Sequence, residues 1–143
     1  MVLMTWNLGR RTHADQARII AAANPDVVAL QEVSARCWAS LTQALERTGL
    51  PHTHVGRATG SHTSFMMIVA SKWRLEARAL HGVDVPRPDR VQVVLIHAPG
   101  GDVEVVHVHV PAATSSGVAT KVATCDGLAR YLAEPTTRAH PMR

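Results

Sequence analysis

The first candidates for chemistry are an amide and a carboxylate that each follow a short apolar run. Asn7 follows Val2–Trp6, and Glu32 lies two residues beyond Val27–Leu30. A carboxylate can hold a hard cation such as Mg²⁺, and an amide can hydrogen-bond a metal-bound water or a phosphate oxygen. A purely structural alternative also stands, in which Asn7 makes a turn and Glu32 caps the following helix.

Histidines form a second group of candidates. His107 and His109 are two residues apart in an apolar run, so both imidazoles should point to the same face of a strand. His97, at the end of the preceding apolar run, would bring a third imidazole, and three imidazoles can bind zinc. A His-based zinc hydrolase is therefore one hypothesis. The alternative is that His107 faces solvent or packs in a polar layer.

The elements around Asn7 and Glu32 predict how these two residues are brought together. Val2–Trp6 and Val27–Leu30 read as strands, and the apolar spacing of Ala17 and Ile20 between them predicts a helix. Strand, helix and strand over about thirty residues make a βαβ unit with parallel strands and a right-handed crossover. Parallel strands end at one edge of the sheet, where ligands bind. Asn7 and Glu32 should therefore meet.

The remainder of the chain predicts two further helices and several antiparallel strands. A second helix should bury Trp38, Leu41 and Leu45 and stop at Gly49. The strand-like runs are Phe65–Ala70, Leu75–Leu80, Val91–His97 and Val103–Val110. The residues expected on the buried side of the last helix are Val118, Val122, Cys125, Ala129 and Leu132. The expected fold class is α/β (α+β) with mixed sheets, in one domain over residues 1–135 with an irregular tail over 136–143.

Composition excludes some classes of protein. The 143 residues are 46% hydrophobic and 18% charged, a balance that can bury a core. No apolar run approaches the ~20 residues that span a bilayer, so we expect a soluble cytoplasmic protein. Two cysteines, Cys37 and Cys125, lack metal spacing and read as buried thiols. The net charge of +4 is not concentrated in a cluster that would single out nucleic acid.

Four segments in order resemble the endonuclease/exonuclease/phosphatase family, which has the deoxyribonuclease-I-like fold. Thr5-Trp6-Asn7 and then Asn24–Val33, which contains Leu30-Gln31-Glu32, carry the more specific part of the resemblance. Ile68–Trp73 is similar to the family's central strand and the Ser-basic turn after it. His109-Val110-Pro111, before a Ser/Thr-rich loop and a helix, resembles the family's histidine segment.

The resemblance implies a partial four-layer α/β sandwich and a metal-dependent hydrolase of the phosphodiesterase or nuclease type. Glu32 would then be the ligand of Mg²⁺ or Mn²⁺. Asn7 would lie beside it, at the metal and at the phosphate or attacking water. His109 would contact the scissile phosphate. The implied substrates are phosphoesters in nucleic acid, phospholipid headgroups or small molecules. His107 is not part of the match, so a supporting or structural role is expected for it.

The sequence departs from the family in its second half. The family's Gly-Asp-x-Asn and Ser-Asp-His segments, which supply the water-activating carboxylate and a paired histidine, do not occur. The chain covers the first half to three-fifths of a family domain, so we expect a C-terminally truncated domain, weakly active or inactive by itself. Half of a two-chain enzyme, self-association at an open sheet edge, and a non-catalytic binding module are the alternatives.

Overall fold

The computed structural model describes residues 1–9, 15–57, 65–79, 84–110 and 117–133. The chain divides into two compact units. The first combines Met1–Ala79 with Asp89–His109, and the second combines Leu80–Pro88 with Val110–Arg143. The candidate residues Asn7, Glu32 and His109 all belong to the first unit.

The βαβ unit predicted at the start of the chain is present. Strand β1 (Leu3–Asn7) pairs in parallel with β2 (Val27–Ser34), and helix α1 (Asp15–Ala23) connects them. Asn24 ends the connection with φ at 45°, a left-handed conformation that asparagine tolerates better than most residues. In the parallel register Asn7 lies opposite Gln31, the residue before Glu32.

Two antiparallel strands complete the first sheet. Its strand order is β1-β2-β4-β3, with β3 at His52–Arg57 and β4 at Phe65–Ser71. β4 was predicted from its apolar run. β3 was not, because its sequence, His-Thr-His-Val-Gly-Arg, is polar and holds one large apolar residue. It forms because the fully buried β4 needs a hydrogen-bonding partner along both edges.

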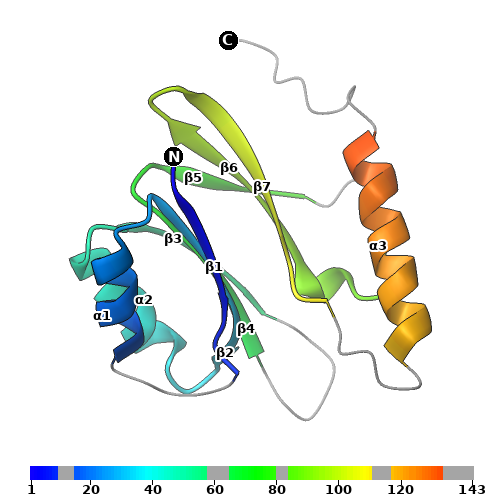
Figure 1. Cartoon of the computed structure of the whole chain (residues 1–143), viewed down its shortest axis with the longest axis horizontal. Helices are drawn as coiled ribbons and strands as arrows, with labels where there is room; N and C mark the ends of the chain where they lie inside the picture. The colour runs from blue at the N-terminus through cyan, green and yellow to red at the C-terminus, as the bar shows by residue number, and fades with distance from the viewer. Residues whose placement is uncertain (10–14, 58–64, 80–83, 111–116, 134–143) are drawn as a thin grey trace. The chain divides into compact units, whose positions relative to one another are not determined.

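Helices α1 and α2 (Trp38–Arg47) lie on the same side of this sheet (Figure 1). They enclose one apolar core with it. The buried members include Ile20, Leu41 and Leu45 from the helices and Leu30 and Ile68 from the strands. Trp38 was expected on the buried face of α2 but is 36% exposed, since it is the first residue of the helix and has no preceding turn.

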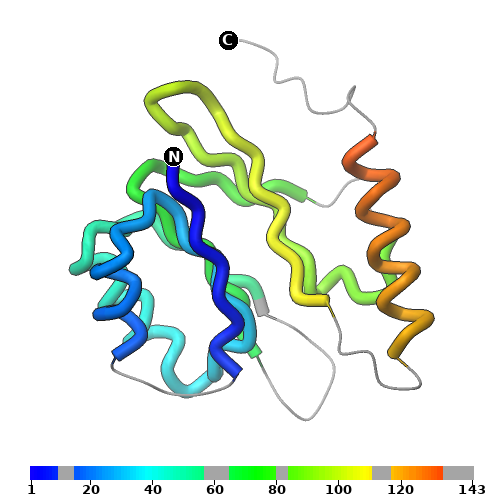
Figure 2. The backbone as a smooth tube through the Cα atoms, in the orientation of Figure 1, coloured from blue at the N-terminus to red at the C-terminus, as the bar shows by residue number. Residues whose placement is uncertain are grey.

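The second sheet covers the opposite face of the first one. It has the order β5-β6-β7, with β5 at Leu75–Arg78, β6 at Val91–Ala98 and β7 at Gly101–Val108, and all its pairings are antiparallel as predicted. A short 3₁₀ turn, η1 (Pro88–Arg90), leads into β6. β6 and β7 form a long hairpin (Figure 2). Apolar residues of the two sheets pack together between them: Val27, Val69, Val94, Ile96 and Val105.

In the second unit, helix α3 (Gly117–Ala133) packs against the segment at Asp84 and Val85. A Cβ atom at Gly127 would collide with the Asp84 carbonyl oxygen, so only glycine permits this close approach. The buried residues of α3 are Thr124, Gly127 and Tyr131.

The buried side predicted for α3 is therefore wrong. Val118, Val122 and Leu132 are 51%, 54% and 57% exposed. Cys125 is also exposed, which corrects the expectation that both thiols are buried, and Cys37 is partly buried. Backbone approach at Gly127, rather than the apolar stripe, selects the packed side. The predicted tail at 136–143 and Pro111 lie outside the described residues. None of the described helices is long and apolar enough to cross a membrane.

Candidate active site

The site begins with an irregularity in β2. The register of β2 against β4 shifts between Leu30 and Val33, and Glu32 has a positive φ of 52°. Successive side chains of a regular strand point to opposite faces. Here the bulge turns Glu32 to the side that Gln31 also faces, toward the second sheet. A non-glycine residue held in this conformation stores backbone strain, of order 1 kcal/mol or more.

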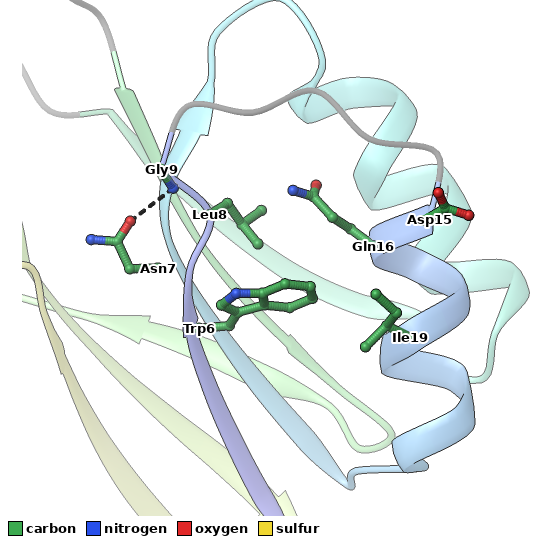
Figure 3. Close-up of a pocket in the computed structure, with 7 residues that line it drawn as sticks. All are labelled: Trp6, Asn7, Leu8, Gly9, Asp15, Gln16 and Ile19. Carbon is green, nitrogen blue, oxygen red and sulfur yellow. Dashed lines mark hydrogen bonds between the residues drawn. The ribbon is translucent and has the colours of Figure 1, made fainter.

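Asn7 lies next to Glu32, as the parallel strands predicted. Its Nδ2 donates to Glu32 Oε1 at 3.2 Å. Its Oδ1 accepts a hydrogen bond of 2.9 Å from the backbone N–H of Gly9, whose φ is +58° (Figure 3). Since a backbone N–H can only donate, this bond fixes which end of the amide faces Gly9. Asn7 therefore presents an N–H to the carboxylate.

His109 reaches the same carboxylate oxygen from the end of the second sheet. Its Nε2 lies 3.1 Å from Glu32 Oε1, and the side chains of His109 and Glu32 are 11% and 23% exposed. Burial is the main cause that lowers the pKa of His109, and the charge of Arg90 lowers it further. Glu32 opposes both. The imidazole is therefore neutral at neutral pH, and its Nε2–H donates to Glu32.

The donor set fits one divalent cation held by a single carboxylate. Mg²⁺ is commonly bound by one or two carboxylates and completes its octahedron with waters and substrate phosphate oxygens. Glu32 is partly exposed and supplies such an oxygen. Among the described residues no group of three or more His, Cys, Asp or Glu side chains could enclose a metal. Ligation of the metal by the Asn7 amide oxygen stays a prediction. In this structure that oxygen accepts a hydrogen bond from the backbone N–H of Gly9.

The prediction of a zinc site made of His97, His107 and His109 is wrong. Gln92 lies opposite His107 in the β6–β7 hairpin, whereas His97 lies opposite Asp102. The five residues from Gln92 to His97 correspond to about 17 Å along the strand. His97 Nδ1 bonds Asp102 Oδ1 at 2.9 Å instead.

A cavity of about 540 Å³ lies beside the site but on the other face of β1. Figure 3 shows Trp6, Leu8 and Ile19 directed into the space between β1 and α1, while the Asn7 side chain points away from it. Asn7 lines the cavity together with these residues, whereas Glu32 is not among the residues that line it.

Sequence reasoning missed three residues near the site. Arg90 acts on His109 through its charge, and Gln31 and Gln92 both hydrogen-bond His107. Gln92 carried a signal, since it is a lone amide within the apolar run Val91–Ile96. Arg90 carried none, because it is a single arginine before the apolar run Val91–His97.

Two facing sheets with helices outside, and a site at the carboxyl ends of β1 and β2, define a deoxyribonuclease-I-like fold. A humanized TDP2 from D. rerio has a TM-score of 0.66 at 15% identity, with 94% of this chain and 57% of that chain covered. Sphingomyelinase C from Streptomyces griseocarneus gives 0.61 at 20% identity, with coverages of 93% and 59%. Truncated TDP2 from Caenorhabditis elegans gives 0.60 at 18%, with coverages of 91% and 55%. The chain therefore spans slightly more than half the length of these proteins.

The sequence profile of the endonuclease/exonuclease/phosphatase family matches residues 4–141, and the chain belongs to this family. A search of the curated proteins gave no match. Membership relates the chain to phosphoesterases and nucleases, and the enzymes of this family typically depend on a divalent metal ion.

Proposed function

We propose that this chain carries the metal-binding part of a phosphoesterase active site, with Glu32 as the ligand of Mg²⁺ or Mn²⁺. The observation that supports it is the convergence of two N–H donors, from Asn7 and His109, on Oε1 of Glu32. Two neutral donors that reach this carboxylate from two sides give it a fixed orientation. In metalloproteins, hydrogen-bond partners orient the side chains that bind the metal in the same way.

The side chains around Glu32 suit attack on a phosphoester. In-line displacement at phosphorus builds negative charge on the non-bridging oxygens, and a bound divalent cation neutralises part of it. Asn7 and His109 both donate to Glu32 Oε1, so the carboxylate that would hold the cation is already fixed in place and needs little reorganisation. Burial lowers the pKa of His109, so the imidazole makes this contact as a neutral donor.

We propose further that this chain alone turns over substrate slowly or not at all. The carboxylate that activates water in the family belongs to its Gly-Asp-x-Asn segment, and this segment does not occur in the sequence. The proposed substrate is a phosphoester in nucleic acid, in a phospholipid headgroup or in a small molecule. The similar solved structures, a sphingomyelinase C and TDP2, do not select one of these classes, and neither does the net charge of +4.

A Mn²⁺ titration followed by electron paramagnetic resonance tests the metal site. Glu32→Gln removes the charged ligand while leaving an oxygen in place, and we expect Mn²⁺ affinity to fall at least about tenfold. Glu46→Gln is the matched control, because Glu46 is an exposed carboxylate on α2. Equal binding by the parent and Glu32→Gln would contradict the assignment.

A second candidate is half of a two-chain enzyme. Within the described residues β1 and β7 each pair along one edge, and Val2 and Leu3 are 58% and 51% exposed beside the β1 edge. A partner could pair with these edges and supply the absent acidic segment. Light scattering over a range of concentrations tests it, and a monomer that recruits no partner would argue against it. A partner that binds without restoring turnover would instead indicate a non-catalytic interaction module.

A further inference from the structure

A chain of buried polar side chains crosses from one sheet to the other behind the Glu32–His109 contact. Gln31 Nε2 lies 2.6 Å from His107 Nε2, and His107 Nδ1 lies 3.0 Å from Gln92 Oε1. Gln92 Nε2 then donates to the Met67 carbonyl oxygen at 3.1 Å. We call the three side chains Gln31, His107 and Gln92 the cross-sheet latch. They are only 8%, 3% and 6% exposed.

The latch joins the sheets at two points within a largely apolar interior. Gln31 and Met67 belong to the first sheet, whereas His107 and Gln92 belong to the second. Room for Gln92 comes from Gly56 in β3, where a Cβ atom would collide with the Gln92 amide. Apolar contacts between sheets carry little directional preference, but a hydrogen-bonded chain fixes both spacing and register.

The carbonyl oxygens of Met67 and Ala29 can only accept, so they orient the Gln92 and Gln31 amides and set the hydrogen-bond roles in the latch. Gln31 Nε2 is an amide nitrogen and can only donate, so His107 Nε2 accepts. His107 therefore carries its proton on Nδ1 and donates to Gln92 Oε1. Only a neutral imidazole can do both. The structure agrees, since burial lowers the pKa of His107 to about 4.

Two members of the latch lie next to the two halves of the candidate site. Gln31 immediately precedes Glu32 at the β2 bulge, and His107 is two residues before His109. Glu32 belongs to the first sheet and His109 follows the last strand of the second, yet they approach to 3.1 Å. Sliding of one sheet over the other would separate them, and the hydrogen bonds of the latch resist such sliding.

We propose that the cross-sheet latch positions the Glu32 carboxylate against His109, with His107 as the central positioning residue. This inference rests on the proposed function, in which Glu32 holds the metal. A merely structural latch would affect the stability of the fold alone. A positioning latch affects the Glu32–His109 contact and metal affinity in a protein that remains folded.

His107→Leu, which removes both hydrogen bonds at similar volume, tests the proposal. We expect a folded protein with Mn²⁺ affinity at least about tenfold lower, the size of effect found for partners that orient metal ligands. The ¹⁵N shift of His109 Nε2 should move toward that of an imidazole without a carboxylate partner. His107→Gln should recover most of both properties, because its amide oxygen can accept from Gln31. His97→Leu is the control, since it removes an imidazole from the far end of the same hairpin.

A His107→Leu protein with parental Mn²⁺ affinity and parental His109 shift would overturn the proposal. Equal losses in His107→Leu and His107→Gln would do the same, as would a parental His107 protonated on Nε2. If His107→Leu does not fold, Gln92→Leu removes only the far hydrogen bonds, and the same two measurements decide. If the parent binds Mn²⁺ no better than Glu32→Gln, the proposed function fails, and the His109 shift alone decides whether the latch positions the carboxylate.

Discussion

Glu32 combines an unfavourable backbone conformation with a favourable set of side-chain contacts. Its φ of 52° turns the carboxylate toward Asn7 and His109, and an unstrained strand residue would point to the other face. Strain of this kind persists only where neighbouring structure holds it. The parallel register with β1 and the hydrogen bonds of Gln31 supply that support.

The charges around His109 predict opposite effects of two substitutions. Arg90→Gln removes a positive charge that lowers the pKa of His109, so this pKa should rise. Glu32→Gln removes an interaction that raises it, so the pKa should fall. A shift of the same sign in both variants, followed by NMR titration of the imidazole, would contradict the electrostatic assignment. His52→Gln, on the outer strand β3, serves as a control that should leave the titration in place.

His107 predicts a pH-dependent stability. Its folded pKa of about 4 lies below the usual value of 6.5, so between these values the unfolded chain binds a proton that the folded protein does not. Stability contributed by the neutral imidazole is therefore complete above pH 6.5 and is lost as the pH falls toward 4, by up to roughly 3 kcal/mol. Urea unfolding from pH 7 to 4 should show a shallower loss in His107→Gln than in the parent. Parallel curves would disprove the assignment.

At the scale of elements, the β6–β7 hairpin gives its two ends different roles. The end at Gln92 and His107 reaches into the interior between the sheets, whereas the end at His97 and Asp102 forms a pair that is partly exposed. β3 contributes space to this interior, because Gly56 has no side chain where the Gln92 amide lies. The β6–β7 hairpin therefore supports the candidate site at one end and forms a separate polar turn at the other.

Gly56→Ala tests this arrangement of strands. The added methyl group would displace the Gln92 amide, and overpacking of a filled interior typically costs about 1–3 kcal/mol. Gly100→Ala is the matched control, since no atom lies within 4 Å of its added Cβ and its φ is not positive. Chemical denaturation should show a loss in the first variant only. Equal stability of the two variants would show that the interior has room beside Gln92.

At the scale of the whole molecule, the first unit leaves strand edges open in both of its sheets. β1 and β7 each have one pairing partner among the described residues. Exposed edges are sites of pairing with other chains. Leu3, 51% exposed on the edge strand β1, adds apolar surface there.

We propose that this edge mediates self-association, and we predict that Leu3→Lys reduces it, because a lysine on an edge strand opposes pairing with another strand. Sedimentation velocity at several concentrations should show a shift toward monomer, with Mn²⁺ affinity unchanged. Leu132→Lys is the comparison, since Leu132 is similarly exposed but lies on α3. A shift caused by Leu132→Lys alone would place the association on that helix and not on the strand edge.

Much of the fold could be predicted where local pattern and packing agree. The parallel β1–β2 pair and the β5–β6–β7 hairpins follow from apolar runs separated by a helix or by turns. β3 could not be predicted, because its pairing depends on β4 rather than on its own residues. The packed side of α3 was mispredicted, because close backbone contact at Gly127 outweighs an apolar stripe.

By itself the sequence determined that Asn7 and Glu32 lie at one edge of the sheet, since parallel strands end at the same edge. The tertiary structure decided everything that joins the two sheets. It separated His97 from His107, turned Glu32 through the bulge, and set His107 between Gln31 and Gln92. These contacts link residues 15 to 77 positions apart, and no local periodicity encodes which strand faces which across an interior.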